Sequence, residues 1–498
     1  MLTLSRILSK SFKKFKNKNC IWVENKYFTY NELEQLSNKF LKLIKFEVQE
    51  AVCIISDKNI NCYSAILATV LSNKIYVPLN PKFPLDRNKK ILSQFKSKII
   101  ILDKKYLKDM NKIMKNESVM KIVFDNSNIS ILGKDSNTKK KFKKNKLNSN
   151  CYTLFTSGST GTPKKISISN RNLITYLNNV KKIYKPSPND RFSHNFDLTF
   201  DLSLHDIFLC WLSGACLYVT PPEHLINPGF FVKKYKLTFW FSVPSLGSNM
   251  LKMKQLKKNI FPYLKQTLFC GEPLSSYLVQ KWQIAAPNSI IENLYGPTET
   301  TIAILRYRWN KKYSLKECED NIVPIGKPFK NQKAICLGKK EVSELALSGS
   351  QVFSGYTNKK ENKSKFVRKL NKNKWYKTGD LVKVNSAKNF LFKSRIDEQI
   401  KVRGHRVEIT EIENAINKII KNTETCVLGV PKLNKNNYNY LNLVAFVPRY
   451  IKNNPDDIIK KLKKILPAYL LPSKIIKIKN FPLNSNGKLD KNKLRNFL

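Results

Sequence analysis

Residues 152–164 combine groups that could hold the phosphates of a nucleotide. The stretch reads Tyr-Thr-Leu-Phe-Thr-Ser-Gly-Ser-Thr-Gly-Thr-Pro-Lys, an apolar run that ends in hydroxyls, two glycines and a lysine. Glycines let a ligand approach the backbone closely, and N–H groups and hydroxyls donate to phosphoryl oxygens. The spacing of a Walker loop is absent, and a polar surface turn is the alternative interpretation. We predict a buried strand and then a phosphate loop containing Thr156, Ser157, Gly158, Ser159, Thr160, Gly161 and Lys164.

Further polar clusters follow this loop on otherwise apolar segments. An aspartate lies inside the hydrophobic run 200–203, and an aromatic ring, a turn and an acid meet in residues 294–299. Another aspartate lies at a turn in 376–381, an arginine and an aspartate follow in 394–397, and a tight turn at 486–488 carries a lysine. Each cluster alone could be a turn, a helix cap or a surface ion pair. Their order and spacing together favour one shared site.

As a set, these clusters resemble the motifs of the adenylate-forming (AMP-binding) superfamily. The most similar members are amino-acid adenylation enzymes, both stand-alone D-alanine–carrier-protein ligases and peptide-synthetase adenylation domains, and the resemblance extends from residue 27 to residue 488. It implies an α/β fold, with a large N-terminal region of α/β subdomains whose sheets are mixed or parallel and a small, mobile α+β C-terminal domain. It also implies that a carboxylate and ATP give acyl-AMP and pyrophosphate before the acyl group passes to a thiol.

The resemblance assigns roles in nucleotide binding. The loop at 156–164 would hold the β- and γ-phosphates of ATP, and Glu299 would help to hold Mg²⁺, which prefers oxygen ligands beside phosphate. Tyr295 would stack on adenine, and Asp380 would accept hydrogen bonds from both ribose hydroxyls. The other nucleotide-binding positions would be Gly296, Thr298 and Arg395.

Lys488 and Thr156 would be the catalytic residues. Lys488 would bridge the substrate carboxylate and the charge that develops at the α-phosphate. One unit charge about 4 Å away is worth roughly 4 kcal/mol at an effective dielectric near 20. Asp397 would be the hinge of a domain swing that removes Lys488 and brings the Gly404 region to the thiol. No general base is required, because a carboxylate is already a nucleophile.

Asp201 would decide the substrate class, because amino-acid-activating members pair an aspartate at this place with the α-ammonium group. Asp197, in the Phe-Asp pair just before it, is an alternative, but Ser203 and Asp206 follow Asp201 as they do in the superfamily. The matching pocket positions carry no other charge, which favours a small or medium neutral side chain, with D-alanine-like substrates preferred. They are Leu202, His205, Ser245, Leu268, Cys270, Leu294, Ile302 and Ala303.

The segments between the clusters predict the elements that position them. Short β-rich runs alternate with helical patterns, which is typical of α/β proteins with largely parallel sheets. These runs lie at 51–56, 98–102, 121–124, 236–241 and 267–270. The pattern changes near residue 396, where a small unit with its own apolar periodicity begins. We predict an adenylation core of residues 1–396 that binds ATP and the amino acid, and a mobile domain of 397–498 that carries Lys488.

The formal net charge of +54 makes nucleic-acid binding an alternative function. Lys, Asn and Ile are abundant together and lysine is spread evenly, so A/T-rich codon usage accounts for the charge, and we expect no nucleic-acid partner. A basic surface also suits a small acidic carrier protein. Because the chain ends 10 residues after Lys488, we expect a phosphopantetheinylated carrier protein to arrive in trans. An acyl-CoA ligase for a non-amino carboxylic acid is the alternative enzyme.

The hydropathy and the cysteines of the sequence indicate the cellular compartment of the protein. No apolar run approaches the roughly 18 residues of a membrane span. The ten cysteines are scattered and form no Cys-x-x-Cys pair, so we expect buried thiols in a reducing compartment and no zinc site. The sequence therefore predicts a cytoplasmic protein without a membrane span.

Overall fold

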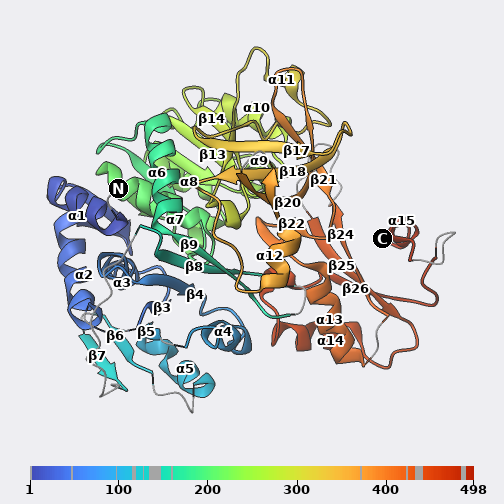
Figure 1. Ribbon diagram of the computed structural model, residues 1–498, viewed down its shortest axis with the longest axis horizontal. Coiled ribbons are helices and arrows are strands. Elements are labelled where there is room, and N and C mark those ends of the chain that lie inside the picture. Colours follow the sequence, from blue (N-terminus) through green and yellow to red (C-terminus); the bar gives the residue numbers. More distant parts are fainter. Residues whose placement is uncertain are drawn as a thin grey trace.

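The structure of the protein is a computed structural model. It describes residues 3–45, 47, 49–96, 98–114, 119–126, 128–133, 147–158, 161–370, 373–421, 424–431, 441–483 and 489–498. Three sheets and their helices form a large region, and a smaller unit formed by the last hundred residues lies against one side of it (Figure 1). The predicted α/β fold, with mixed sheets and a small α+β unit at the C-terminal end, is confirmed.

A seven-stranded sheet forms one half of the large region, in the order β7-β6-β5-β3-β4-β8-β9. Its strands are β3 (Ala51–Ile55), β4 (Ile75–Leu79), β5 (Lys98–Asp103), β6 (Lys121–Asp125), β7 (Asn128–Leu132), β8 (Asn150–Thr156) and β9 (Lys164–Ser169). The five strands from β6 to β8 are parallel. Every residue of β3 is buried, because helices cover both faces of a parallel sheet. The helices of this half are α1 (Leu4–Lys14), α2 (Tyr30–Ile44), α3 (Ile60–Leu71), α4 (Leu85–Leu92) and α5 (Leu107–Ile113), with the 3₁₀ turn η1 (Lys104–Tyr106).

A nine-stranded sheet forms the other half, in the order β16-β15-β14-β13-β12-β10-β11-β1-β2. Its strands are β1 (Asn19–Val23), β2 (Lys26–Thr29), β10 (Arg191–His194), β11 (Cys216–Val219), β12 (Phe239–Ser242), β13 (Gln266–Cys270), β14 (Ile290–Tyr295), β15 (Leu305–Arg308) and β16 (Lys327–Pro328). Its helices are α6 (Asn170–Tyr184), α7 (Leu202–Ser213), α8 (Pro228–Lys234), α9 (Pro244–Lys252), α10 (Ser276–Ala285) and α11 (Ser314–Glu317), with η2 (Pro222–Leu225) and η3 (Thr298–Thr300). Helix α7 is buried along its whole length and belongs, with α3, to one apolar core that joins the two sheets.

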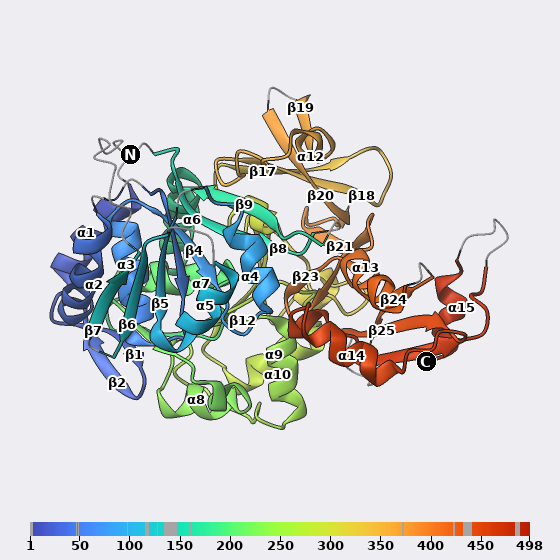
Figure 2. The ribbon, with the colours of Figure 1, turned by 90° about the horizontal axis from the view of Figure 1, so that it is seen from below.

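An antiparallel sheet of five strands completes the large region. It contains β17 (Gln332–Leu337), β18 (Ser343–Gly349), β19 (Phe366–Leu370), β20 (Asn373–Val384) and β21 (Phe390–Arg395), with helix α12 (Lys359–Lys365). Figure 2 shows this sheet at one edge, above the C-terminal unit.

The C-terminal unit begins with a two-stranded hairpin, β22 (Ile400–Val402) and β23 (His405–Val407). The rest of the unit comprises α13 (Ile409–Ile420), β24 (Cys426–Pro431), β25 (Leu441–Pro448), α14 (Pro455–Lys463), η4 (Ala468–Leu470), β26 (Lys474–Ile478) and α15 (Lys491–Arg495). An apolar cluster drawn only from residues 402–475 forms its main core. Ile396, just before the hairpin, is 59% exposed. None of the helices in the described parts of the chain is long and apolar enough to cross a membrane.

Candidate active site

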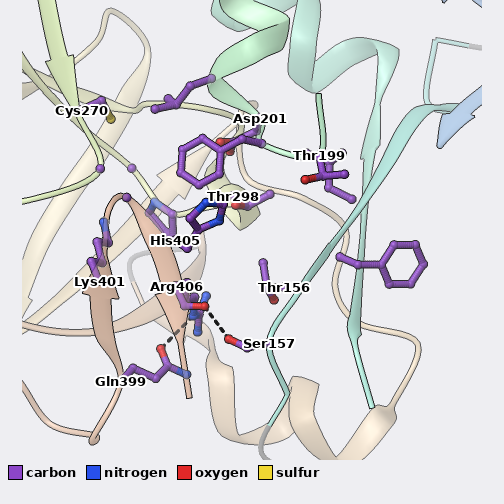
Figure 3. Close-up of a pocket in the computed structure, with 18 of the residues that line it drawn as sticks. Thr156, Ser157, Thr199, Asp201, Cys270, Thr298, Gln399, Lys401, His405 and Arg406 are labelled. Atoms are coloured by element: carbon purple, nitrogen blue, oxygen red, sulfur yellow. Dashed lines mark hydrogen bonds between the residues drawn. The ribbon is translucent and has the colours of Figure 1, made fainter. Parts of the chain in front are cut away.

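A pocket lies where the hairpin β22–β23 meets the large region (Figure 3). Its walls come from the ends of β8, β13 and β14, the segment before α7, the strands β20 and β21, and the hairpin. Polar side chains from distant segments converge here because the carboxyl ends of neighbouring parallel strands open on the same edge of a sheet. The lining includes Thr156, Ser157, Asp201, Leu202, Cys270, Gly296, Thr298, Ile302, Asp380 and Arg395, all of which were predicted from the sequence.

The described part of the predicted phosphate loop borders this pocket and a second cavity of about 240 Å³. Gly158 leaves no room for a side chain, since a Cβ there would lie 2.2 Å from the carbonyl oxygen of Thr162. Lys164 lies beside the second cavity, where its Nζ pairs with Glu361 at 3.3 Å and lies 4.2 Å from the centre of the Tyr356 ring. The predicted loop residues 159 and 160 lie outside the described residues.

Ser157 binds the hairpin in this structure. Its hydroxyl donates to the carbonyl oxygen of Arg406 at 2.5 Å and accepts from the backbone N–H of Glu408 at 3.2 Å. Figure 3 shows Arg406 between Ser157 and Gln399. The same loop that was predicted to hold phosphate therefore also offers a hydroxyl to the C-terminal unit.

Glu299 is fully buried and ionised. The guanidinium of Arg406 donates to its two oxygens at 2.9 and 3.2 Å, and the hydroxyl of Tyr356 donates to it at 2.5 Å. Burial alone would raise the pKa of Glu299, but Arg406 and Tyr356 outweigh it and lower the pKa to about 2. A buried carboxylate that is held anionic beside a phosphate loop is a fitting ligand for Mg²⁺, which commonly takes one or two carboxylates together with phosphate oxygens.

Asp380 and Arg395 pair directly across β20 and β21 at the pocket edge. The hydroxyl of Tyr295 donates to the other oxygen of Asp380, and its ring packs in the apolar cluster behind the pocket. Arg395 also donates from Nε to Asp397 at 2.6 Å. The predicted ribose-binding residue and the predicted hinge residue are thus joined through one guanidinium.

Two aspartates competed in the sequence for the ammonium-binding role, and their surroundings differ. Asp201 lines the pocket, is 6% exposed and has a pKa raised to about 7, because burial outweighs a hydrogen bond from Thr298 and the charge of Lys401. Asp197 lines a different cavity and accepts hydrogen bonds from Asn80 at 2.5 Å and from Thr199. Only Asp201 faces the space that Thr156 and Cys270 also line.

Some of the predicted substrate-binding residues line the pocket, and the others do not. Leu202, Cys270 and Ile302 line the pocket together with Asp201. The others are buried and do not line the pocket, namely His205, Ser245, Leu268, Leu294 and Ala303. His205 accepts or donates a hydrogen bond with the Tyr176 hydroxyl at 2.7 Å, and burial lowers its pKa to about 3, so its imidazole is neutral.

The hairpin and the residue before it supply pocket residues that were not among the predicted site residues, namely Gln399, Ile400, Lys401, His405 and Arg406. The backbone N–H of Gly404 donates to Glu272 at 2.7 Å, and Glu272 also accepts from the N–H of Ser245 at 2.8 Å. The resemblance predicted that the Gly404 region approaches the thiol, but no local pattern indicated which surface of the large region the hairpin contacts. Lys488 lies outside the described residues, and the described residues from 479 onward do not line this pocket.

A buried ion pair fastens the C-terminal unit in this position. Nη1 of Arg87 in α4 donates to Glu411 in α13 at 2.8 Å, and the two side chains are 5% and 4% exposed. Tyr469 stacks on His405 of the hairpin with ring centres 4.0 Å apart, and its hydroxyl lies 3.4 Å from Nη2 of Arg87. Arg87 of the large region therefore contacts two residues of the C-terminal unit, and one of them, Tyr469, stacks on the hairpin.

We expect Arg87→Met to release the hairpin. Removing one member of a buried ion pair leaves the other charge uncompensated and costs about 3–5 kcal/mol, enough to lower the equilibrium constant for docking of the C-terminal unit by more than about 100-fold. Hydrogen exchange at residues 400–407 measures this, and we expect faster exchange there than in the unaltered protein. Lys89→Met, at an exposed position of the same helix, is the control. Equal exchange in both variants would contradict the anchoring role.

Comparisons with known proteins agree with this geometry. A family model described as AMP-binding enzyme matches residues 8–357. Among curated proteins, the chain is 26% identical over 515 residues to surfactin synthase subunit 2 of Bacillus subtilis (strain 168), covering 99% of this chain and 14% of that protein. It is also 26% identical to bacitracin synthase 1 of Bacillus licheniformis, covering 99% and 9%. It is 28% identical to zwittermicin A synthase ZmaJ of Bacillus cereus, covering 93% and 89%. The chain thus spans a small part of the first two relatives and most of the third.

A comparison with solved structures also finds adenylation domains. The Vibrio cholerae adenylation domain AlmE, in complex with glycyl-adenosine-5'-phosphate, matches with a TM-score of 0.87 and 27% identity, over 100% of this chain and 98% of that chain. NpsA-ThdA, an artificially fused adenylation–PCP di-domain from Klebsiella oxytoca, matches with a TM-score of 0.77 over 95% and 93% of the two chains. At 19% identity, the second match shows the fold alone.

Proposed function

Because the chain belongs to the AMP-binding enzyme family, an AMP-forming group of enzymes, we propose that it activates a small neutral amino acid with ATP. The product would be aminoacyl-AMP, and the aminoacyl group would pass to the phosphopantetheine thiol of a separate carrier protein. The proposal that the substrate is an amino acid rests on Asp201, a buried carboxylate on the pocket wall. Burial raises the pKa of Asp201, and this effect outweighs the hydrogen bond from Thr298 and the charge of Lys401. An ammonium group of the substrate would supply the missing charge.

The pocket wall supports a small substrate. Leu202, Cys270 and Ile302 surround Asp201 with apolar surface, and burial raises the pKa of the Cys270 thiol to about 12, so it stays neutral. These three side chains carry no charge, which favours an uncharged substrate side chain. We propose D-alanine, glycine or a similar small amino acid, and the glycyl-adenosine-5'-phosphate bound by AlmE is consistent with this size.

In the proposed reaction, Thr156, Ser157, Gly158, Ser159, Thr160, Gly161 and Lys164 bind the departing phosphates. Glu299 holds Mg²⁺, which would neutralise phosphate charge when bound. Asp380 and Arg395 hold the ribose, while Tyr295, Gly296 and Thr298 form the adenine side. Lys488 joins the carboxylate to the α-phosphate during adenylation.

We further propose that residues 1–396 and 397–498 act as two domains that move about Asp397. Glu299 and Ser157 now bind Arg406 of the hairpin, so Mg²⁺ and phosphate need these groups released. An arrangement with the hairpin withdrawn would serve adenylation, and the present one would serve thiol transfer. The ten cysteines are all free thiols, which supports a cytoplasmic site for the reaction.

Exchange of labelled pyrophosphate into ATP tests the proposal. We expect exchange that depends on an amino acid, measured across a panel of both enantiomers and glycine, with the strongest signal for small neutral members. Absence of exchange with the whole panel would overturn the amino-acid assignment. Transfer to a phosphopantetheinylated carrier protein, followed by intact-mass measurement of the carrier, tests the second half-reaction separately.

The amino-acid KM is expected to depend on pH through Asp201. Its pKa of about 7 in the empty pocket means that the carboxylate is mostly protonated at pH 6 and mostly ionised at pH 8. Because the substrate ammonium needs the ionised form, KM for the amino acid should fall by about tenfold between pH 6 and pH 8. Exchange assays at fixed saturating ATP measure this. In Asp201→Asn the fall should disappear, and its persistence there would assign the titration to another group.

A further inference from the structure

A cavity of about 720 Å³ lies outside the proposed active site. It is surrounded by the residues that follow β1, β3, β4, β5, β10 and β11, so strand ends of both large sheets face it. Of all the residues lining it, only Thr199 also lines the pocket beside Asp201. Its size falls within the roughly 300–1,000 Å³ of small-molecule sites.

The position of this cavity in the fold is typical of a binding site. Strand β3 lies between β4 and β5. Helix α3, which follows β3, packs in the core on one face of the sheet, and α5, which follows β5, packs in the cluster on the other face. The strand order therefore reverses between β3 and β5, and open α/β sheets bind ligands outside the carboxyl ends of strands at such a point. Residues after both strands, Lys58 and Lys105 among them, line the cavity.

Most carboxylates of the cavity already have partners. Asp57 pairs with Lys105 at 2.5 Å and accepts from the Tyr106 hydroxyl at 3.0 Å. Both oxygens of Asp197 accept hydrogen bonds, from Asn80 and Thr199. Glu24 accepts from the first N–H of α3 at 3.2 Å. The remaining carboxylate, Glu223, is exposed at the rim.

Lys58 differs from these groups. It is half-buried, and among the described residues none forms an ion pair or a hydrogen bond with its ammonium group. Burial lowers its pKa to about 8, and the attraction of Asp197, Asp206 and Cys62 offsets this only in part, while Lys82 adds repulsion. Asp206 contributes little negative charge, because burial raises its pKa well above the usual range. The interior of the cavity therefore contains a cation with unused hydrogen-bonding capacity.

We propose that this cavity is a second ligand site, which binds a small anionic molecule bearing a phosphate or carboxylate group through Lys58. Lys82 lies at the rim without an ion pair among the described residues and adds a second positive charge. Apolar wall residues such as Leu79, Leu198 and Val219 contact the uncharged part of the ligand. The site is separate from the proposed adenylation chemistry, so either can fail without the other.

Pyridoxal 5'-phosphate followed by borohydride reduction tests the site in the full-length protein. The probe carries a phosphate and an aldehyde; the aldehyde condenses with a lysine amine, water leaves, and borohydride reduces the imine to a stable secondary amine. At pH 7.5, peptide mass spectrometry should find Lys58 modified at least about tenfold faster than the exposed Lys39, because more of its amine is unprotonated. Modification of Lys58 at the rate of Lys39 or slower would overturn the proposal.

Competition identifies the anion. Glycerol 3-phosphate and succinate are added separately at rising concentration, and protection of Lys58 by either one, with a saturating dose response, supports the site and tells phosphate from carboxylate. ATP, which is expected at the phosphate loop, should protect Lys164 and leave Lys58 accessible. Failure of both competitors to protect Lys58 would overturn the proposal.

Three variants separate binding from folding. Lys82→Met should weaken protection by the effective competitor by at least about threefold, and Lys39→Met, a matched exposed control, should leave it unchanged. Lys58→Met should lose the modified peptide while amino-acid-dependent pyrophosphate exchange stays at the level of the unaltered protein. Equal protection in Lys82→Met and Lys39→Met would remove Lys82 from the site, and loss of exchange in a folded Lys58→Met would show that the cavity is not separate from the chemistry.

Discussion

Replacing Asp201 by alanine is expected to lower kcat/KM for the amino acid by at least about 100-fold. The substrate ammonium would then enter a largely buried pocket without a counter-charge, and an uncompensated buried charge costs about 3–5 kcal/mol. The side chain is 6% exposed, so water cannot replace it well. Amino-acid-dependent pyrophosphate exchange with saturating ATP measures the loss, and KM for ATP should change little because we propose that Asp201 binds the amino acid and not the nucleotide.

Asp197→Asn is the matched control, since Asp197 precedes Asp201 by four residues and lines the other cavity. Asparagine keeps an acceptor for Thr199, so we expect an effect of less than about tenfold on the same kcat/KM. A large loss in Asp197→Asn with a small loss in Asp201→Ala would reverse the assignment of the two residues. Small losses in both would favour a carboxylic acid without an amino group as the substrate.

Local patterns in the sequence predicted several strands of the two large sheets, because strands buried on both faces of a parallel sheet have sequences that are short continuous apolar runs. The run at 51–56 became β3, the run at 98–102 became β5, and the run at 267–270 became the end of β13. The loop after β8 was also recognisable, since its glycines and hydroxyls are consecutive. The antiparallel sheet β17–β21 was not predicted, because strands such as β17 and β20 mix buried with half-buried and exposed residues and contain lysines and an asparagine.

The contacts that close the site could not be predicted from local patterns. Arg406 and Glu299 are 107 residues apart, Ser157 and Arg406 are 249 apart, and Arg87 and Glu411 are 324 apart. Taken by itself in the sequence, each of these residues is typical of a surface charge or of a turn. The packing of the C-terminal unit on the strand ends gives Glu299 its guanidinium partner, which lowers its pKa together with Tyr356, so the electrostatics of the site depend on the position of that unit.

Lys488→Ala is expected to reduce adenylate formation by about 1,000-fold while sparing thiol transfer from preformed aminoacyl-AMP. The magnitude follows from one unit charge beside the reacting phosphate, worth roughly 4 kcal/mol if it acts mainly in the transition state. Pyrophosphate exchange measures the first half-reaction, and carrier acylation from synthetic aminoacyl-AMP measures the second. Lys452→Ala, at an exposed lysine of the same unit, should leave both unchanged.

Gly404→Ala is the reciprocal variant. Gly404 has φ +80°, and a Cβ there would lie 2.4 Å from Cγ1 of Val243, so alanine is disfavoured both by its backbone angle and by contact with the large region. The hairpin should then leave the pocket, which would weaken thiol transfer and leave pyrophosphate exchange intact. If the two half-reactions need different positions of the C-terminal unit, Lys488→Ala and Gly404→Ala must fail in opposite assays. Equal loss of both half-reactions in both variants would mean that one arrangement performs the whole reaction, and the hairpin contacts at Ser157 and Glu299 would then be permanent.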